Sequence, residues 1–426
     1  MDFFVSYILP FFYTFLIAAL LYRNKMFRNN GWQGKWVVLF FLAKCVSAVA
    51  NSYISIKYIP HGGDVPLYFG DGLQLYQTLI HHPSNFFPQL NQLFTFNDAD
   101  VMNPHSGIMN SVFGGIKFIH FLLNLFSFGN LYTNVILFNG LATWLFIRCW
   151  IFFKQILGTN AAGAWLFLLP SAFYNCSGLL KEGILLVLIA AIFPLIYKVI
   201  NRFSVKLLLQ CAVLFLLMVF FKFLIAFTFL AAMTLWWLML RFPQKRLPIV
   251  VLTVILGVAC FFSLGIISPK LNMQQYLVNR QQEFLTLDAH SKIDVPQLQP
   301  TFSSFLLSLP TALNNVFFKP LPGEGGKILY LPFTVEIFLF WILLAVAWAK
   351  NKWNANFKGI PSLVWALLVF AMVNLLIIGY TIPNIGAITR YRSIFLPFVG
   401  LFFWMAFNGD KMLTSILGKN KLTNKS

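Results

Sequence analysis

Charged residues are scarce in this chain of 426 residues. Asp, Glu, Lys and Arg make up 10% of the sequence, whereas a soluble globular domain carries about 25%. So few charges cannot cover a water-exposed surface of this size, which excludes a soluble globular protein. Hydrophobic residues account for 59% of the chain and the mean hydropathy is +0.76, values typical of an integral membrane protein.

Several motifs of well-known enzyme classes are also missing. The chain has no HExxH, GxSxG or P-loop sequence, which argues against zinc proteases, α/β-hydrolases and P-loop nucleotidases. Its five cysteines form no CxxC pair and none lies in a long polar segment, so the sequence predicts neither a disulfide framework nor a metal site.

Long apolar runs fill most of the chain, and a membrane span needs about 20 such residues. The first run has no basic segment before it and no small-residue cleavage site after it, so we expect a retained span rather than a signal peptide. The stretch 112–128 is apolar but contains Lys117 and His120, and it fits a span, a re-entrant element or an interfacial helix. The predicted spans are 3–22, 36–57, 131–150, 161–179, 183–200, 206–221, 223–240, 247–267, 332–349, 360–380 and 393–408.

The predicted fold is therefore an all-α, polytopic transmembrane helical bundle of about 11 spans (10–12), with residues 1–426 forming a single integral membrane domain. Lys and Arg cluster in the short segments between spans, so the net charge of +19 indicates positive-inside topology rather than nucleic-acid binding. This pattern places the N-terminus outside and the segment 409–426 inside, as a basic cytoplasmic tail. The two long loops, 58–111 and 268–331, then lie outside the cytoplasm and carry short interfacial helices.

Most acidic residues fall on the outer side in this topology, and Asp410 is the one placed inside. Asp64 and Asp71 follow Gly62-Gly63 in the first outer loop, and both are candidate catalytic carboxylates. Tyr76, close behind them, is a candidate for binding the glycan substrate. An alternative is purely structural: Asp71 would cap a surface helix running from Leu73 to Ile80, and Asp64 would occupy a turn.

Basic residues that interrupt apolar sequence are candidates for binding a lipid phosphate. Lys181 and Glu182 form a pair at the outer end of two spans, where ionisable groups are costly and often functional, although the pair also fits a neutral hairpin tip. Lys222 splits a long apolar run, either as an anion contact or as a lysine reaching the membrane surface. Arg390 and Arg392 match the planar geometry of phosphate oxygens, or pair with loop acids. Weaker candidates for the same role are Arg280, Lys292, Lys319 and Lys327.

The combination resembles bacterial multi-spanning glycosyltransferases of the GT-C type and related polysaccharide polymerases, especially Bacteroidetes-type envelope proteins. The pattern comprises Gly62-Gly63-Asp64, Tyr68 to Asp71, Pro170 to Glu182, Lys222, and Arg390 to Arg392 followed by Pro397. The resemblance implies a polyprenyl-phosphate-linked sugar donor and transfer on the outer face of the bacterial inner membrane. A loop aspartate would act as general base or hold a divalent cation, and the basic residues would neutralise the departing phosphate.

We therefore expect a membrane glycosyltransferase of cell-surface glycan assembly. A polysaccharide polymerase or ligase would need the outer arginines more than a loop aspartate. A lipid or glycan transporter would place charges at the midplane of the bilayer, where Lys44 is the one candidate. A structural protein of envelope assembly would use the 268–331 loop to dock protein partners. The expected partners are thus the bilayer and a polyprenyl-linked glycan, with no nucleic acid and no predicted metal ligands.

Overall fold

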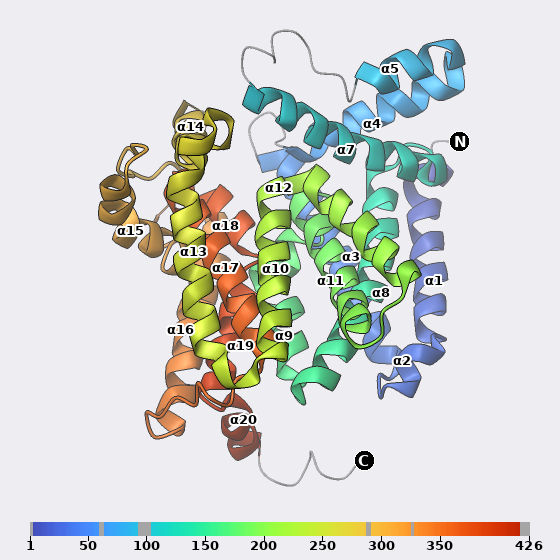
Figure 1. The fold of residues 1–426 in the computed structure, drawn as a ribbon. Coiled ribbons are helices and arrows are strands. Elements are labelled where there is room, and N and C mark those ends of the chain that lie inside the picture. Colours follow the sequence, from blue (N-terminus) through green and yellow to red (C-terminus); the bar gives the residue numbers. More distant parts are fainter. Residues whose placement is uncertain (1–2, 59–63, 93–103, 287–290, 325–327, 418–426) are drawn as a thin grey trace. The chain divides into compact units, whose positions relative to one another are not determined.

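A computed structural model describes residues 3–58, 64–92, 104–286, 291–324 and 328–417 of the chain (Figure 1). Within these ranges the regular elements are helices, and an isolated β-bridge joins Lys292 to Asn384. The prediction of an all-α membrane helical bundle is therefore confirmed. Gly62, Gly63 and Lys327 lie outside the described residues.

The helices gather into two compact units, each built from more than one stretch of chain. The first unit comprises Met1–Phe152 and Phe173–Ala226, and the second comprises Phe153–Ala172 and Phe227–Ser426. The boundaries between the units fall inside helices, because α8 (Leu131–Leu157), α10 (Pro170–Asn175) and α12 (Val205–Arg241) each contribute residues to both units.

Long apolar helices form the body of the first unit. Inside α12, Lys222 has an extended backbone (φ −159°, ψ 86°), so the helix is interrupted where the sequence predicted a division between two spans. The long helices are α1 (Leu9–Tyr22, after a π-helical turn at Phe4–Ile8), α3 (Gly34–Tyr58), α8 (Leu131–Leu157), α11 (Lys181–Asn201) and α12 (Val205–Arg241), and the short helix α2 (Lys25–Asn29) follows α1.

Three further helices of this unit belong to the region after α3: α4 (Asp64–His81), α5 (Phe86–Gln92) and α7 (Pro104–Ser127). Figure 1 shows α7 running across the end of the upright helix α1. The Tyr13 hydroxyl of α1 donates a hydrogen bond to the Phe126 carbonyl of α7 at 3.1 Å, which fixes this crossing. The crosswise course of α7 favours the interfacial alternative for the stretch 112–128.

Helix α4 begins earlier than the sequence suggested. It starts at Asp64 rather than near Leu73, so Asp71 lies inside the helix and its interpretation as an N-cap is wrong. Asp64 lies in the first turn, where a carboxylate interacts favourably with the positive end of the helix dipole. Pro66 fits the same turn, because a backbone N–H there has no helical acceptor to lose.

The predicted span 161–179 is not one helix but two short ones, α9 (Ala161–Leu168) and α10 (Pro170–Asn175). Between them Leu169 leaves the helical region (ψ 126°), as expected for a residue that precedes proline. The chain then stays non-helical and buried from Cys176 to Leu180. Backbone polar groups inside a membrane must find partners within the protein, so this segment needs specific support.

The second unit centres on α17, which packs against α14, α15 and α19. Helices α14 and α15 belong to the predicted 268–331 loop, and α20 begins the C-terminal segment at Gly409. The bounds are α13 (Arg246–Ile267), α14 (Met273–Thr286), α15 (Phe302–Phe317), α16 (Leu331–Lys350), α17 (Ser362–Thr381), α18 (Ile385–Arg392), α19 (Leu396–Ala406) and α20 (Gly409–Leu417), with short 3-10 turns at Pro243–Lys245, Pro269–Leu271 and Ile328–Tyr330.

Eight of the described helices are long and apolar enough to cross a membrane, so the chain is a multi-pass membrane protein. One of the eight, α12, contains two of the predicted spans, and the apolar helix α19 is shorter. Together with the broken α9–α10 segment, these helices include all eleven apolar runs that the sequence predicted.

Close packing of α4 on α7 leaves no room for a side chain at Gly72. A Cβ atom there would lie 2.6 Å from the Lys117 carbonyl oxygen and 2.6 Å from the His120 Cβ. We expect Gly72→Ala to destabilise the protein by about 1–3 kcal/mol, because backbone must shift to admit the methyl group. Thermal unfolding of the purified protein would measure this.

Gly70→Ala is the matched control, because it is the same change in the same helix and a Cβ there meets no atom within 4 Å. A Gly70→Ala protein as stable as the parent or slightly more stable is expected. Equal unfolding temperatures for both variants would contradict the close α4–α7 contact.

Candidate functional site

The predicted site residues divide between the two units. Asp64, Asp71, Tyr76, Lys181, Glu182 and Lys222 belong to the first unit, and Arg280, Arg390 and Arg392 to the second.

Helix α4 presents the two predicted carboxylates of the first unit. Asp71 forms an ion pair with Lys117 of α7, with a distance of 2.5 Å between Oδ2 and Nζ. Asp64 lies half-buried at the start of the helix, and Tyr76 is half-buried five residues before the end of the helix at His81. Because the Asp71 carboxylate joins α4 to α7 through this ion pair, Asp64 is the better candidate for a chemical role.

Lys181 lies against helix α4. Its Nζ is 5.8 Å from the ring centre of Tyr68, a residue with no exposed surface. Tyr68 follows Asp64 by four residues on α4, and side chains four apart on a helix are neighbours on one face. The structure thus brings the predicted Lys181 to within one helical turn of the predicted Asp64, although 117 residues of sequence separate them.

Glu182 and Lys222 differ in their surroundings. Glu182 lies in the first turn of α11 and is 2% exposed, so its carboxylate is enclosed beside the positive end of that helix. Lys222 is half-buried at the interruption of α12.

A buried histidine of α7 contacts both α4 and α8. His120 of α7 packs its ring edge-on against Phe69 of α4, at 5.8 Å between centres, and contacts the amide of Asn134 at 3.4 Å. Burial lowers the pKa of His120 to about 3. The ring is therefore neutral at physiological pH and serves as a polar packing residue rather than as a cation.

In the second unit, Arg392 is fully buried. Its Nη1 donates to the Val316 carbonyl at 3.2 Å and to the Lys319 carbonyl. Burial lowers the pKa of Arg392 to about 10 and the Glu336 carboxylate raises it, so the guanidinium stays charged at neutral pH. These contacts show Arg392 supporting the end of α15.

Glu336 of α16 is the acidic member of this cluster and is 4% exposed. It accepts hydrogen bonds from the Ser171 hydroxyl at 2.6 Å and from the Ser171 backbone N–H. The sequence indicated neither the contact between Ser171 and Glu336 nor the electrostatic interaction between Glu336 and Arg392. The available signal was an acidic residue inside an apolar run, which is costly in a membrane unless it is paired.

Arg390 and Arg280 are more accessible than Arg392. Arg390 is half-buried, its guanidinium lies 4.9 Å from the ring centre of Tyr391, and its Nη2 donates to the Tyr391 hydroxyl at 3.0 Å. Arg280 pairs with Glu283, with 2.6 Å between Nη1 and Oε2. Arg390 is thus the stronger candidate for a phosphate contact in this unit.

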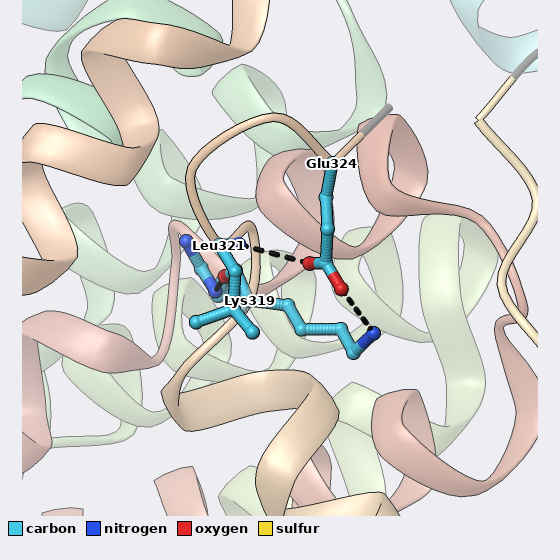
Figure 2. A network of polar contacts seen from close by, with 4 residues as sticks. Lys319, Leu321 and Glu324 are labelled. Atoms are coloured by element: carbon cyan, nitrogen blue, oxygen red, sulfur yellow. Dashed lines mark hydrogen bonds and ion pairs between the residues drawn. The ribbon is translucent and has the colours of Figure 1, made fainter. Parts of the chain in front are cut away.

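Lys319 also takes part in an ion pair on the second unit. Figure 2 shows the Glu324 carboxylate between the Lys319 ammonium, at 2.7 Å, and the Leu321 backbone N–H, at 2.8 Å. Desolvation raises the pKa of Glu324, but the hydrogen bonds from Leu321 and Lys319 outweigh it and lower the pKa below its ordinary value of 4.5.

This shift predicts a small loss of stability in acid. A carboxyl group with a lowered pKa in the folded state stabilises the fold above its unfolded pKa, and the stabilisation is lost as the pH falls through the folded pKa. We expect a contribution below about 1 kcal/mol, because the side chain of Glu324 is 26% exposed. Unfolding temperatures of the parent and Glu324→Gln proteins between pH 7 and pH 3 should converge toward the acid end. Parallel curves would contradict the interpretation.

Among the described residues no three His, Cys, Asp or Glu side chains gather as metal ligands. No protein-family model, curated protein or solved structure matches the chain. Any functional conclusion therefore depends on the geometry above.

Proposed function

We propose that the protein is a membrane glycosyltransferase that uses a polyprenyl-phosphate-linked sugar on the outer face of the bacterial inner membrane. The observation that carries the proposal is the approach of Lys181 to α4, one turn from Asp64. An aspartate and a lysine then lie about one helical turn apart on α4 and at the start of α11. A lipid-linked sugar phosphate presents its reacting atoms at this level, between the lipid tails and water.

Each residue has a distinct role in the proposed reaction. The acceptor hydroxyl attacks the anomeric carbon of the donor, and Asp64 takes the hydroxyl proton. The bond between the anomeric carbon and the phosphate oxygen breaks, and the polyprenyl phosphate leaves with the electron pair. Lys181 neutralises the charge that develops on that oxygen, which is among the larger contributions available to catalysis.

A polysaccharide polymerase is the second candidate, and the ion pair between Asp71 and Lys117 favours it. That pair removes one of the two loop carboxylates from the candidate chemistry. A polymerase joining lipid-linked glycans depends more on cationic groups such as Arg390, whose guanidinium is half-buried and fixed on Tyr391.

The test is a comparison of polyprenyl-linked glycans in cells with and without this protein. Lipid extracts analysed by mass spectrometry should show one precursor that accumulates in its absence and disappears when the gene is restored. Purified protein in liposomes should then convert that precursor when the acceptor is supplied. An unchanged glycan pool in the cells would remove the enzyme proposal and leave transport or envelope assembly.

A further inference from the structure

The non-helical segment Cys176–Leu180 is held by polar side chains from two helices of the first unit. Asn139 of α8 donates from Nδ2 to the Ser177 carbonyl at 2.8 Å. On the α3 side, the Asn51 side-chain oxygen lies 3.0 Å from the position of a Cβ on Gly178, so that residue has little space for a side chain.

Lys44 of α3 provides the strongest of these contacts. Its Nζ donates to the Ser177 hydroxyl at 2.9 Å, and that hydroxyl donates in turn to the Phe173 carbonyl. The ammonium group also lies over the rings of Phe146 and Phe173, at 4.9 and 5.1 Å from their centres. Lys44 is 1% exposed, so its ammonium group makes its contacts inside the protein.

The position of Lys44 matters because α11 begins directly after this segment. Lys181 and Glu182 are the first two residues of α11, four and five positions beyond Ser177. A backbone free to move at Ser177 would also let Lys181 move away from Tyr68 and α4. A buried lysine in a membrane helix is costly, and it persists where a specific function offsets that cost.

We infer that Lys44 is a positioning residue: through Ser177 it fixes the segment Cys176–Leu180 and thereby places Lys181 and Glu182 against α4. The expected effect of Lys44 on glycan transfer rests on the proposed function, but its expected effect on the position of Cys176–Leu180 does not. Cysteine labelling therefore tests the positioning role, and glycan transfer tests the proposed function.

Native cysteines report on the structural effect. Cys176 is adjacent to Ser177 and is fully buried, whereas Cys149 of α8 is equally buried but makes no contact with Lys44 among the interactions described. Labelling by N-ethylmaleimide requires water and a thiolate, so a buried cysteine reacts when its segment opens. We expect Lys44→Met, in the intact membrane protein, to increase the labelling rate of Cys176 about 10-fold, the effect of losing one hydrogen bond to a charged group. Labelling of Cys149 should not change.

The matched control is Lys57→Met, the same change near the end of the same helix, where the exposed Lys57 contacts Tyr53. Ser177→Ala removes the same hydrogen bond with a smaller change in volume, and it should also expose Cys176 selectively. The inference is overturned if Cys176 stays protected in both variants, or if Cys149 becomes reactive to the same extent. Selective exposure of Cys176 with unchanged glycan transfer would support the positioning role and refute the proposed function.

Discussion

Replacement of Arg392 by methionine is expected to lower the free energy of unfolding by about 3–5 kcal/mol. Removing a buried charged group leaves its hydrogen-bond partners and any nearby buried opposite charge without compensation, which costs several kcal/mol. Here the carbonyls of Val316 and Lys319 lose their donor, and the Glu336 carboxylate, which is 4% exposed, loses its electrostatic interaction with the guanidinium. Thermal unfolding of the protein in detergent micelles, followed at several heating rates, would measure the loss.

Arg390→Met supplies the control for this experiment. It removes the same charge two residues earlier in α18, from a half-buried side chain, and we expect it to cost about 1 kcal/mol or less. Combining Arg392→Met with Glu336→Gln should recover part of the lost stability, because the second change removes the uncompensated charge. An Arg392→Met protein as stable as Arg390→Met would show that the guanidinium is dispensable for folding and would return Arg392 to the phosphate-binding candidates.

The hydrophobic pattern predicted the helices well because each span is encoded locally. About 20 apolar residues suffice to define a span whatever the rest of the chain does. A single charge was also enough to locate the break at Lys222 inside α12. The break before Pro170 was missed, although proline restricts the residue before it, because apolar sequence continues on both sides.

The contacts of the candidate site could not be predicted from the sequence, because they join residues that are far apart along the chain. Lys44 and Ser177 are 133 residues apart, and Ser171 and Glu336 are 165 residues apart. Such pairs depend on which helices pack together, and the apolar faces of the spans do not specify this in one sequence. The sequence therefore identified Asp64, Asp71, Lys181 and Arg392 as unusual, but it did not show that Asp71 pairs with Lys117 and that Arg392 supports α15.

The pairing of Asp71 separates the two aspartates in function, and this gives the second large expected effect. Asp64→Asn should reduce glycan transfer by about 10²–10⁴-fold at a normal protein level, because an amide cannot accept the proton of the acceptor hydroxyl. Asp71→Asn is the same change in the same helix, and it removes an ion pair worth about 1 kcal/mol or less, so most activity should remain. Conversion of the accumulated polyprenyl-linked precursor by each purified variant in liposomes is the measurement.

Three outcomes of that assay discriminate between the hypotheses. A severe loss in Asp64→Asn alone supports the transferase mechanism, with Asp64 as the base. Full activity of both aspartate variants, together with loss of activity in Arg390→Ala, would favour the polymerase, because a cationic contact with the glycan phosphate would then carry the reaction. Equal losses in Asp64→Asn and Asp71→Asn would mean that the ion pair to Lys117 positions α4 for catalysis, since the Asp71 carboxylate binds Lys117 through Oδ2.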